Sequence, residues 1–238
     1  MDEQMVTGCL NDASLGLIRR LADGREHGRS ELAQAMSLTS PQLDGLINQL
    51  AATDCGLKID THSVALVMPI TVLDRDGIVQ LMDDNVHSVL ARLEVVGVVE
   101  STNATLLNDA QNEWPAISVL LAEGQSHGRG RTQRRWHSPM GVNVYMSAAL
   151  EWQGPLGALA GITPALGIGV ARALQSCGAA DITVKWPNDV YHAGAKVAGV
   201  LVETSAVRRD IHRVVVGIGI NVLPDPTELD VGQSRSTL

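Results

Sequence analysis

Apolar residues recur at helical spacing in three segments of the N-terminal third of the chain. These segments predict helices at Ser14–Ala22, Glu31–Met36 and Gln42–Ala51. Ser30 and Ser40 precede the second and third helices, and we expect them to act as N-caps. Two weak strands, Leu57–Ile59 and Val64–Val67, follow. Helix, tight turn, helix and two strands is the order of a winged helix-turn-helix, which we assign to residues 1–69.

The rest of the chain is expected to form a linker over residues 70–85 and a larger domain over residues 86–238. Its apolar runs predict strands at Val95–Val99, Ile117–Ala122, Asn143–Leu150, Asp181–Val184, Val197–Val202 and Arg213–Val222. Helices are expected at Thr102–Ala110 and Pro155–Ser176. The second helix is apolar enough to be considered as a membrane span, but its proline, arginine and four glycines favour a core helix covered on several sides. The predicted fold class is α+β.

Composition narrows the cellular setting. The chain has 238 residues, of which 45% are apolar, so it can form a substantial core. Its net charge of −8 argues against a general nucleic-acid binder. The scattered Cys9, Cys55 and Cys177 suggest neither disulfides nor a metal site. The N-terminus carries acidic residues where a signal peptide has basic ones, so we expect a cytoplasmic protein with no membrane partner.

The predicted recognition helix, Ser40–Ala51, is poorly suited to DNA. It contains no lysine or arginine and carries one acid, Asp44. Gln42, Asn48 and Gln49 are its only plausible base readers. Operator binding and a purely structural domain therefore remain alternatives.

A cationic glycine-rich segment, Gly124–Trp136, lies between two predicted strands and should be a mobile surface loop. Its four arginines are Arg129, Arg131, Arg134 and Arg135. Guanidinium groups, together with the backbone amides beside Gly128 and Gly130, could enclose a phosphate and an attached carboxylate. On composition alone, a solvated basic turn and a nucleic-acid patch are equally compatible.

Five short blocks occur in a fixed order from about Val95 to the end of the chain. They are Ser101-Thr102-Asn103, GRGR at 128–131, KWPND at 185–189, Lys196 within KVAGVLVE, and GIGIN at 217–221. Together they resemble the biotin protein ligases, in particular the bifunctional bacterial form that doubles as biotin operon repressor.

The resemblance implies a mixed sheet with helices, like that of class II aminoacyl-tRNA synthetases. It also implies ATP-dependent formation of biotinyl-5'-AMP and transfer of biotin to a lysine of the biotin carboxyl carrier protein of acetyl-CoA carboxylase. A homodimer formed on adenylate binding is a further expectation. We expect the catalytic domain to be incomplete and the C-terminal SH3-like barrel to be absent. The alternatives are a ligand-sensing repressor without turnover and a lipoate or octanoate ligase.

The resemblance also assigns roles to individual residues. Biotin would contact Ser101, Thr102, Asn103 and Gln125, whereas Ser101 could also simply cap a helix. The adenylate would be covered by Gly128, Arg129, Gly130, Arg131 and Trp136. Lys196 would hold the carboxylate and phosphate, and Lys185, Asn188 and Asp189 would manage the triphosphate with Mg²⁺ at Asp189.

Structural alternatives accompany several of these roles. Lys185 and Asp189 could form an ordinary surface ion pair, and Lys196 could merely mark a strand edge. Trp186 is expected in the core. Gly217 and Gly219 should leave space for a ligand or another backbone. Gln133 stands where the family loop usually has a glycine, so the loop is expected to be stiffer or differently shaped.

Overall fold

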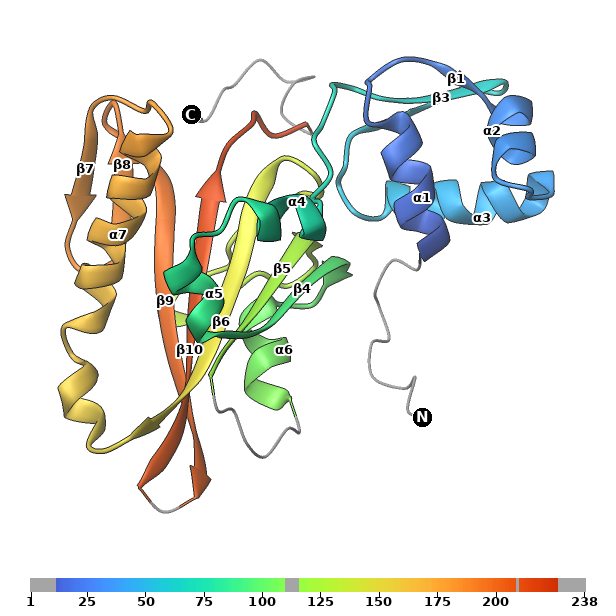
Figure 1. Cartoon of the computed structure of the whole chain (residues 1–238). Helices are drawn as coiled ribbons and strands as arrows, with labels where there is room; N and C mark the ends of the chain where they lie inside the picture. The colour runs from blue at the N-terminus through green and yellow to red at the C-terminus, as the bar shows by residue number, and fades with distance from the viewer. Residues whose placement is uncertain (1–11, 110–115, 209, 227–238) are drawn as a thin grey trace.

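The computed structural model describes residues 12–109, 116–208 and 210–226 (Figure 1). Two sheets organise these residues: a three-stranded sheet of order β1-β3-β2 and a seven-stranded sheet of order β4-β5-β6-β10-β9-β8-β7. The prediction of an α+β protein is therefore confirmed. The expectations for the first ten residues lie outside the described part of the chain.

The N-terminal unit, residues 12–70, combines the small sheet with three helices. The helices are α1 (Asp12–Leu21), α2 (Arg29–Ala35) and α3 (Ser40–Ala51), and the strands are β1 (His27–Gly28), β2 (Leu57–Ile59) and β3 (Ser63–Leu66). Leu17, Ile18 and Leu21 of α1 are fully buried, and they join Leu43 and Ile47 of α3 in one core. The periodicity of the sequence thus predicted these elements correctly.

Both predicted helix caps in this unit were wrong. Helix α2 begins at Arg29, one residue before Ser30. Gly28, the last residue of β1, pairs with Ser63 of β3 and is itself the N-cap. Helix α3 is preceded by Thr39 rather than capped by Ser40, since the Oε1 atom of Gln42 accepts hydrogen bonds from the Thr39 amide at 2.8 Å and hydroxyl at 2.9 Å.

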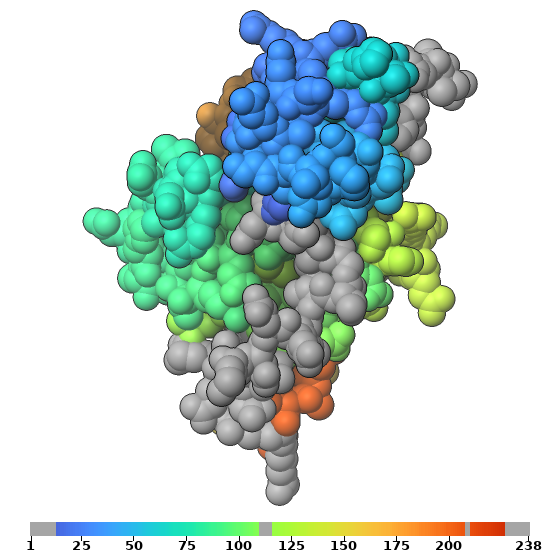
Figure 2. Space-filling view, turned by 90° about the vertical axis from the view of Figure 1, so that its right-hand side faces the viewer, coloured from blue at the N-terminus to red at the C-terminus, as the bar shows by residue number. Residues whose placement is uncertain are grey.

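The N-terminal unit forms a lobe at one end of the molecule (Figure 2). Its apolar core continues into the larger unit through Val98, Met140 and Val142. One backbone hydrogen bond joins the same regions, from the Met140 amide to the Thr53 carbonyl at 3.3 Å. The two units therefore share one continuous apolar contact.

A buried carboxyl group lies close to this junction. Glu123 is 3% exposed, and its Oε1 atom accepts the Leu73 amide at 2.7 Å. Burial raises the pKa of Glu123 to about 7, against the opposing effects of the Leu73 hydrogen bond and the charge of Arg19. The segment expected as a linker also contains α4 (Arg75–Gln80) and the start of α5 (Asp84–Val89).

The large sheet is mixed. Strand β4 (Leu90–Val99) runs parallel to β5 (Ile117–Gln125), and all other pairs are antiparallel. The remaining strands are β6 (Asn143–Gln153), β7 (Ile182–Lys185), β8 (Asp189–His192), β9 (Ala195–Arg208) and β10 (Ile211–Asn221). The predicted strands are all present, and the long central strands extend further than the apolar runs indicated.

Helices cover opposite faces of this sheet. Val215 of β10 packs with Leu106 of α6 (Thr102–Asn108), whereas the neighbouring Val216 packs with Val170 of α7 (Ile162–Ser176). Since side chains alternate along a strand, α6 and α7 lie on different faces. Helix α7 runs along β7, β8 and β9 (Figure 1).

The long helix predicted from Pro155 is divided and is buried on one face. A 3₁₀ turn, η2 (Leu156–Leu159), precedes α7, and the buried residues of α7 are Gly167, Val170, Ala171 and Leu174. Coverage on several sides was therefore a wrong expectation. By length and composition the segment Leu156–Ser176 could cross a membrane, which alone is weak evidence for a span.

Candidate functional site

A pocket of about 470 Å³ opens on the α6 face of the sheet. Ten residues expected to bind substrate line it: Ser101, Thr102, Asn103, Gln125, Arg129, Gly130, Arg131, Trp136, Asn188 and Lys196. They come from the start of α6, the end of β5, the arginine loop, the β7–β8 turn and β9. Further lining residues are Met146, Gly199, Val200, Leu201, Gly217, Ile218 and Gly219.

The start of α6 forms the polar end of the pocket. The Ser101 hydroxyl accepts the Ala104 amide at 3.4 Å, so its expected capping role is confirmed. Gln125 accepts the Thr102 amide at 2.9 Å and donates to Ser138 at 3.0 Å. This network fixes hydroxyl and amide groups at the wall of the pocket before any ligand arrives.

Asn103 occupies space left by a glycine. A Cβ atom added to Gly217 would lie 2.3 Å from the Asn103 Oδ1 atom, and one added to Gly219 would lie 2.6 Å from the Trp136 ring. The glycines of GIGIN therefore leave room, and in this structure two side chains of the pocket fill it rather than another backbone.

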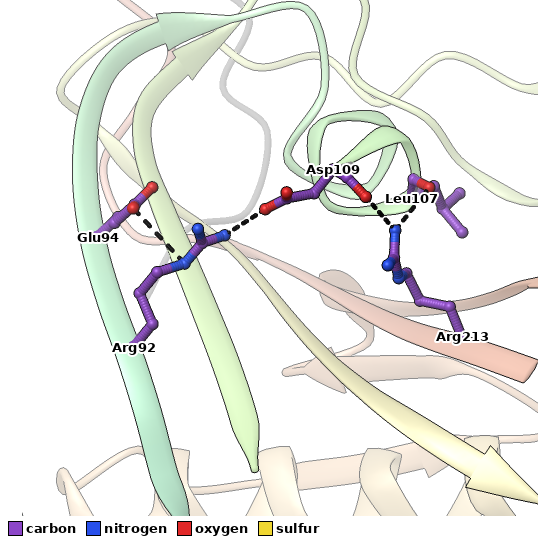
Figure 3. A network of polar contacts seen from close by, with 5 residues as sticks. All are labelled: Arg92, Glu94, Leu107, Asp109 and Arg213. Carbon is purple, nitrogen blue, oxygen red and sulfur yellow. Dashed lines mark hydrogen bonds and ion pairs between the residues drawn. The ribbon is translucent and has the colours of Figure 1, made fainter. Parts of the chain in front are cut away.

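The other end of α6 is held by charged side chains (Figure 3). Arg213 of β10, which is 6% exposed, donates to the carbonyl groups of Leu107 and Asp109. Arg92 of β4 contacts the Asp109 carboxylate at 2.6 Å and Glu94 at 3.5 Å. Because the last carbonyls of a helix have no intrahelical partners, these arginines secure a helix of only seven residues. The predicted end at Ala110 lies outside the described residues.

The arginine loop folds back on itself. Arg129 and Arg135 form an isolated antiparallel bridge, and the Trp136 amide donates to the Gly128 carbonyl at 2.8 Å. A Cβ atom on Gly128 would lie 2.4 Å from the Trp136 carbonyl oxygen, so a larger residue there would disrupt the turn. Gly128 supports the loop and does not line the pocket among the described residues. The mobility of the loop stays a prediction.

Gln133 adopts the backbone conformation that a glycine favours. Its φ is +60°, and that of Thr132 is +53°. Left-handed backbone costs a non-glycine residue about 1–2 kcal/mol. The turn at Thr132 and Gln133 is therefore formed by two non-glycine residues at an energetic cost.

Three cations of the site each contact a partner from the sheet or its turns. Arg129 pairs with Glu203 at 2.9 Å, and Arg131 donates to the Asn188 side chain at 3.0 Å. Lys196 pairs with Asp189 at 2.7 Å and lies 5.2 Å from the Trp136 ring centroid. The expectation that Lys196 is partly enclosed agrees with its half-buried side chain.

The KWPND block is only partly in the pocket. Lys185 lies opposite Asp189 in the β7–β8 hairpin, but its Nζ atom lies over the Tyr191 ring, 5.4 Å from the centroid. Asp189 instead binds Lys196, and neither Lys185 nor Asp189 lines the pocket. Trp186 is 79% exposed, so its expected place in the core was wrong. It follows β7, which is the edge strand of the sheet formed by the described residues.

The site lacks a preformed metal cage within the described parts of the chain. No group of three potential ligands from histidine, cysteine, aspartate or glutamate comes together there. Asp189 supplies a single carboxylate, which suits Mg²⁺ held mainly by substrate phosphates. Its assignment to Mg²⁺ stays a prediction.

The proposed DNA readers are partly engaged within the N-terminal unit. Gln42 accepts from Thr39, and Gln49 accepts the Ser14 hydroxyl at 2.8 Å. Asn48 is exposed. The amide oxygens of two of the three side chains are therefore already used within the unit, whereas these hydrogen bonds do not use their NH₂ groups.

Sequence reasoning missed several residues around the pocket, among them Glu203, Ser147, Ser138 and Met146. Glu203 contacts Asn103, which is 100 positions earlier in the chain. Ser147 lies within hydrogen-bonding distance of Thr102 and Asn103. Such pairings depend on how strands and helices pack, so no local spacing reveals them. Glu203 does close the block KVAGVLVE, which was its only sequence signal.

A pocket that joins amide and hydroxyl groups to a cluster of cations, on a mixed sheet, defines a binding site for an acid and a phosphate. A model of the biotin/lipoate A/B protein ligase family matches residues 95–221. The chain belongs to this family.

The chain is similar to individual ligases and to solved structures of biotin protein ligases. The bifunctional ligase/repressor BirA of Salmonella typhimurium is 36% identical over 223 residues, covering 91% of this chain and 66% of the relative. The biotin--[acetyl-CoA-carboxylase] ligase of Paracoccus denitrificans is 40% identical over 129 residues, covering 53% of each chain. The Aquifex aeolicus biotin protein ligase in complex with biotin and ATP is 36% identical, with a TM-score of 0.42, covering 56% of this chain and 52% of that chain. The chain spans 66% and 64% of the length of BirA from Salmonella typhimurium and Escherichia coli.

Proposed function

We propose that the chain is an ATP-dependent biotin protein ligase. It would form biotinyl-5'-AMP from biotin and ATP and transfer biotin to a lysine of the biotin carboxyl carrier protein of acetyl-CoA carboxylase. The observation that carries the proposal is a single pocket with a neutral polar end at Thr102, Asn103 and Gln125 and a cationic end at Arg129, Arg131 and Lys196. Membership of the family and the names of its relatives support it.

The polar end suits the ureido ring of biotin. That ring offers two N–H donors and one carbonyl acceptor, and the hydroxyl and amide groups of this wall can donate and accept. Met146, Val200, Ile218 and Trp136 supply apolar surface for the rest of the vitamin.

The cationic end suits the first chemical step. A carboxylate oxygen of biotin attacks the α-phosphorus of ATP, and the bond to the β-phosphate breaks to release pyrophosphate. Because both reactants are anions, the step depends on positioned cations. Arg129, Arg131 and Lys196 would exchange their present partners for carboxylate and phosphate oxygens.

The second step needs protection from water. A lysine amine of the carrier attacks the acyl carbon of the anhydride, and AMP leaves. Arg129 and Arg131 in the loop would cover the adenylate until the carrier binds, with Trp136 beside adenine. Bound Mg²⁺ would neutralise charge on the triphosphate. Asp189, which pairs with Lys196, would be the carboxylate that contacts it, and Lys185 would assist from the same hairpin.

Lys196→Ala tests this assignment. Removal of the ammonium group should lower pyrophosphate release with biotin and ATP by about 10²–10³-fold, the usual effect of losing one donor to developing negative charge. Lys58→Ala, on β2 of the N-terminal unit, is the matched control and should leave the rate unchanged. An unaltered rate in the Lys196 variant would remove this residue from the mechanism.

A repressor function is the second candidate, favoured by the helices and hairpin of the N-terminal unit and by relatives named bifunctional ligase/repressor. We propose residues 1–69 as a winged helix-turn-helix, with Gln42, Asn48 and Gln49 as its readers, joined by residues 70–85 to the ligase domain. A homodimer formed on adenylate binding and a cytoplasmic location belong to the same proposal. A gel shift with the promoter of the chain's own gene at low salt tests it, and no shift would refute it.

A further inference from the structure

Glu203 lies outside the pocket lining but contacts two residues within it. Its side chain is 20% exposed. The Oε1 atom pairs with Arg129 at 2.9 Å, and the Oε2 atom accepts the Asn103 Nδ2 atom at 2.9 Å. Both carboxylate oxygens are therefore used, one on the arginine loop and one on α6.

Two acceptors decide which way the Asn103 amide points: the Glu203 carboxylate at 2.9 Å and, at a longer 3.4 Å, the Leu201 carbonyl. A carboxylate accepts hydrogen bonds and donates none, so only the NH₂ end of the amide can face Glu203. The Oδ1 end then lies 2.6 Å from the Ser147 hydroxyl. A carbonyl oxygen has two lone pairs, and Ser147 uses one of them. Asn103 consequently presents an acceptor to the pocket.

We propose that Glu203 is a specificity-determining residue, which fixes Asn103 as an acceptor and so selects an acid whose ring carries N–H donors. This inference rests on the proposed function and deepens it. The ureido ring of biotin has such donors, whereas the dithiolane ring of lipoate and the chain of octanoate have none. A lipoyl group would leave the second lone pair of the buried Asn103 Oδ1 atom without a donor, and a site built to bind a polar group disfavours an analogue that lacks it.

Glu203→Gln replaces a carboxylate, which only accepts hydrogen bonds, by an amide of about the same size. The new amide can donate as well as accept, so either end of Asn103 can face it. In calorimetric titrations of the full chain, the Kd of the variant for biotin should be about tenfold higher than that of the parent. Its Kd for lipoate should change by less than about twofold. Glu94→Gln is the matched control, because Glu94 also pairs with an arginine but lies on β4, outside the pocket. Glu94→Gln should leave the Kd for biotin and the Kd for lipoate unchanged.

Exchanging the amide and the carboxylate between positions 103 and 203 should restore biotin binding. Asn103→Asp alone places two carboxylates together and should weaken biotin binding. Asn103→Asp combined with Glu203→Gln restores a donor facing an acceptor, with the acceptor again on α6. This double variant should bind biotin better than either single variant. The thermal midpoint of each variant, followed by circular dichroism, confirms that it is folded.

The outcomes separate two kinds of failure. If the parent chain binds no biotin, the proposed function fails and the inference with it. If the parent binds biotin and Glu203→Gln either retains the parent Kd or weakens biotin and lipoate equally, only the inference is wrong. Absence of rescue in the double variant would also overturn it.

Discussion

Gly217 of β10 offers a direct test of how the pocket is built, because the side chain of Asn103 occupies the space above it. In Gly217→Ala, the added methyl group would lie 2.3 Å from the Asn103 Oδ1 atom and 2.9 Å from its Cγ atom. Ordinary contacts of a Cβ atom begin at 3.4 Å, so Asn103 must retreat by about 1.1 Å (3.4 − 2.3).

Such a retreat breaks the short hydrogen bonds of Asn103. Its contacts with Ser147 at 2.6 Å and Glu203 at 2.9 Å would both exceed hydrogen-bonding distance. Overpacking of this kind costs about 1–3 kcal/mol of stability. Loss of a positioned acceptor facing the ligand should weaken biotin binding by about 10–100-fold.

Calorimetric titration with biotin and urea denaturation measure the two effects separately. Gly169→Ala on α7 is the control, because no atom lies within 4 Å of its added methyl group. It should raise helix stability by up to about 1 kcal/mol and leave biotin binding unchanged. If Gly217→Ala bound biotin as tightly as the parent, Asn103 would not be a ligand contact and the assigned polar end of the pocket would be wrong.

Two further perturbations test the loop and the junction between the units. Arg131→Gly should remove the contact with Asn188 at 3.0 Å and speed release of the adenylate, detected as biotin labelling of unrelated proteins; retention equal to the parent would contradict the lid role. Glu123→Gln should change how stability varies with pH. The pKa of Glu123 is raised from 4.5 to about 7, so the folded state binds more protons between these values and the parent loses up to about 3 kcal/mol as pH rises through them. Urea denaturation between pH 4.5 and 7 should show a smaller decline in the variant, and parallel curves would refute the argument.

The elements of the fold were largely predictable, because apolar periodicity depends on local sequence. The three N-terminal helices and six of the seven strands of the large sheet lie where the patterns placed them, and β8 is the exception. Caps were less predictable: Thr39 and Ser40 are both capping residues, and the choice between them depended on a side-chain contact with Gln42. Trp186 was misplaced, since burial depends on whether another layer covers the edge of the sheet.

The pocket was predictable wherever its residues lay in recognisable blocks, as for Asn103, Arg131 and Lys196. The partners that orient them were not. Glu203 reaches Asn103 only because β9 passes beside α6 in the folded sheet. Lys185, although within a recognised block, lies against Tyr191 outside the pocket, which no spacing in the sequence indicated.

Incubation of the full chain with α-labelled ATP, and with either biotin or lipoate, tests the proposed activity most directly. Bound products would be identified by mass spectrometry. We expect the protein to retain biotinyl-5'-AMP and to release an equal amount of pyrophosphate, with little lipoyl-AMP formed. Lipoyl-AMP as the main product, or no acyl-adenylate with either acid, would contradict it.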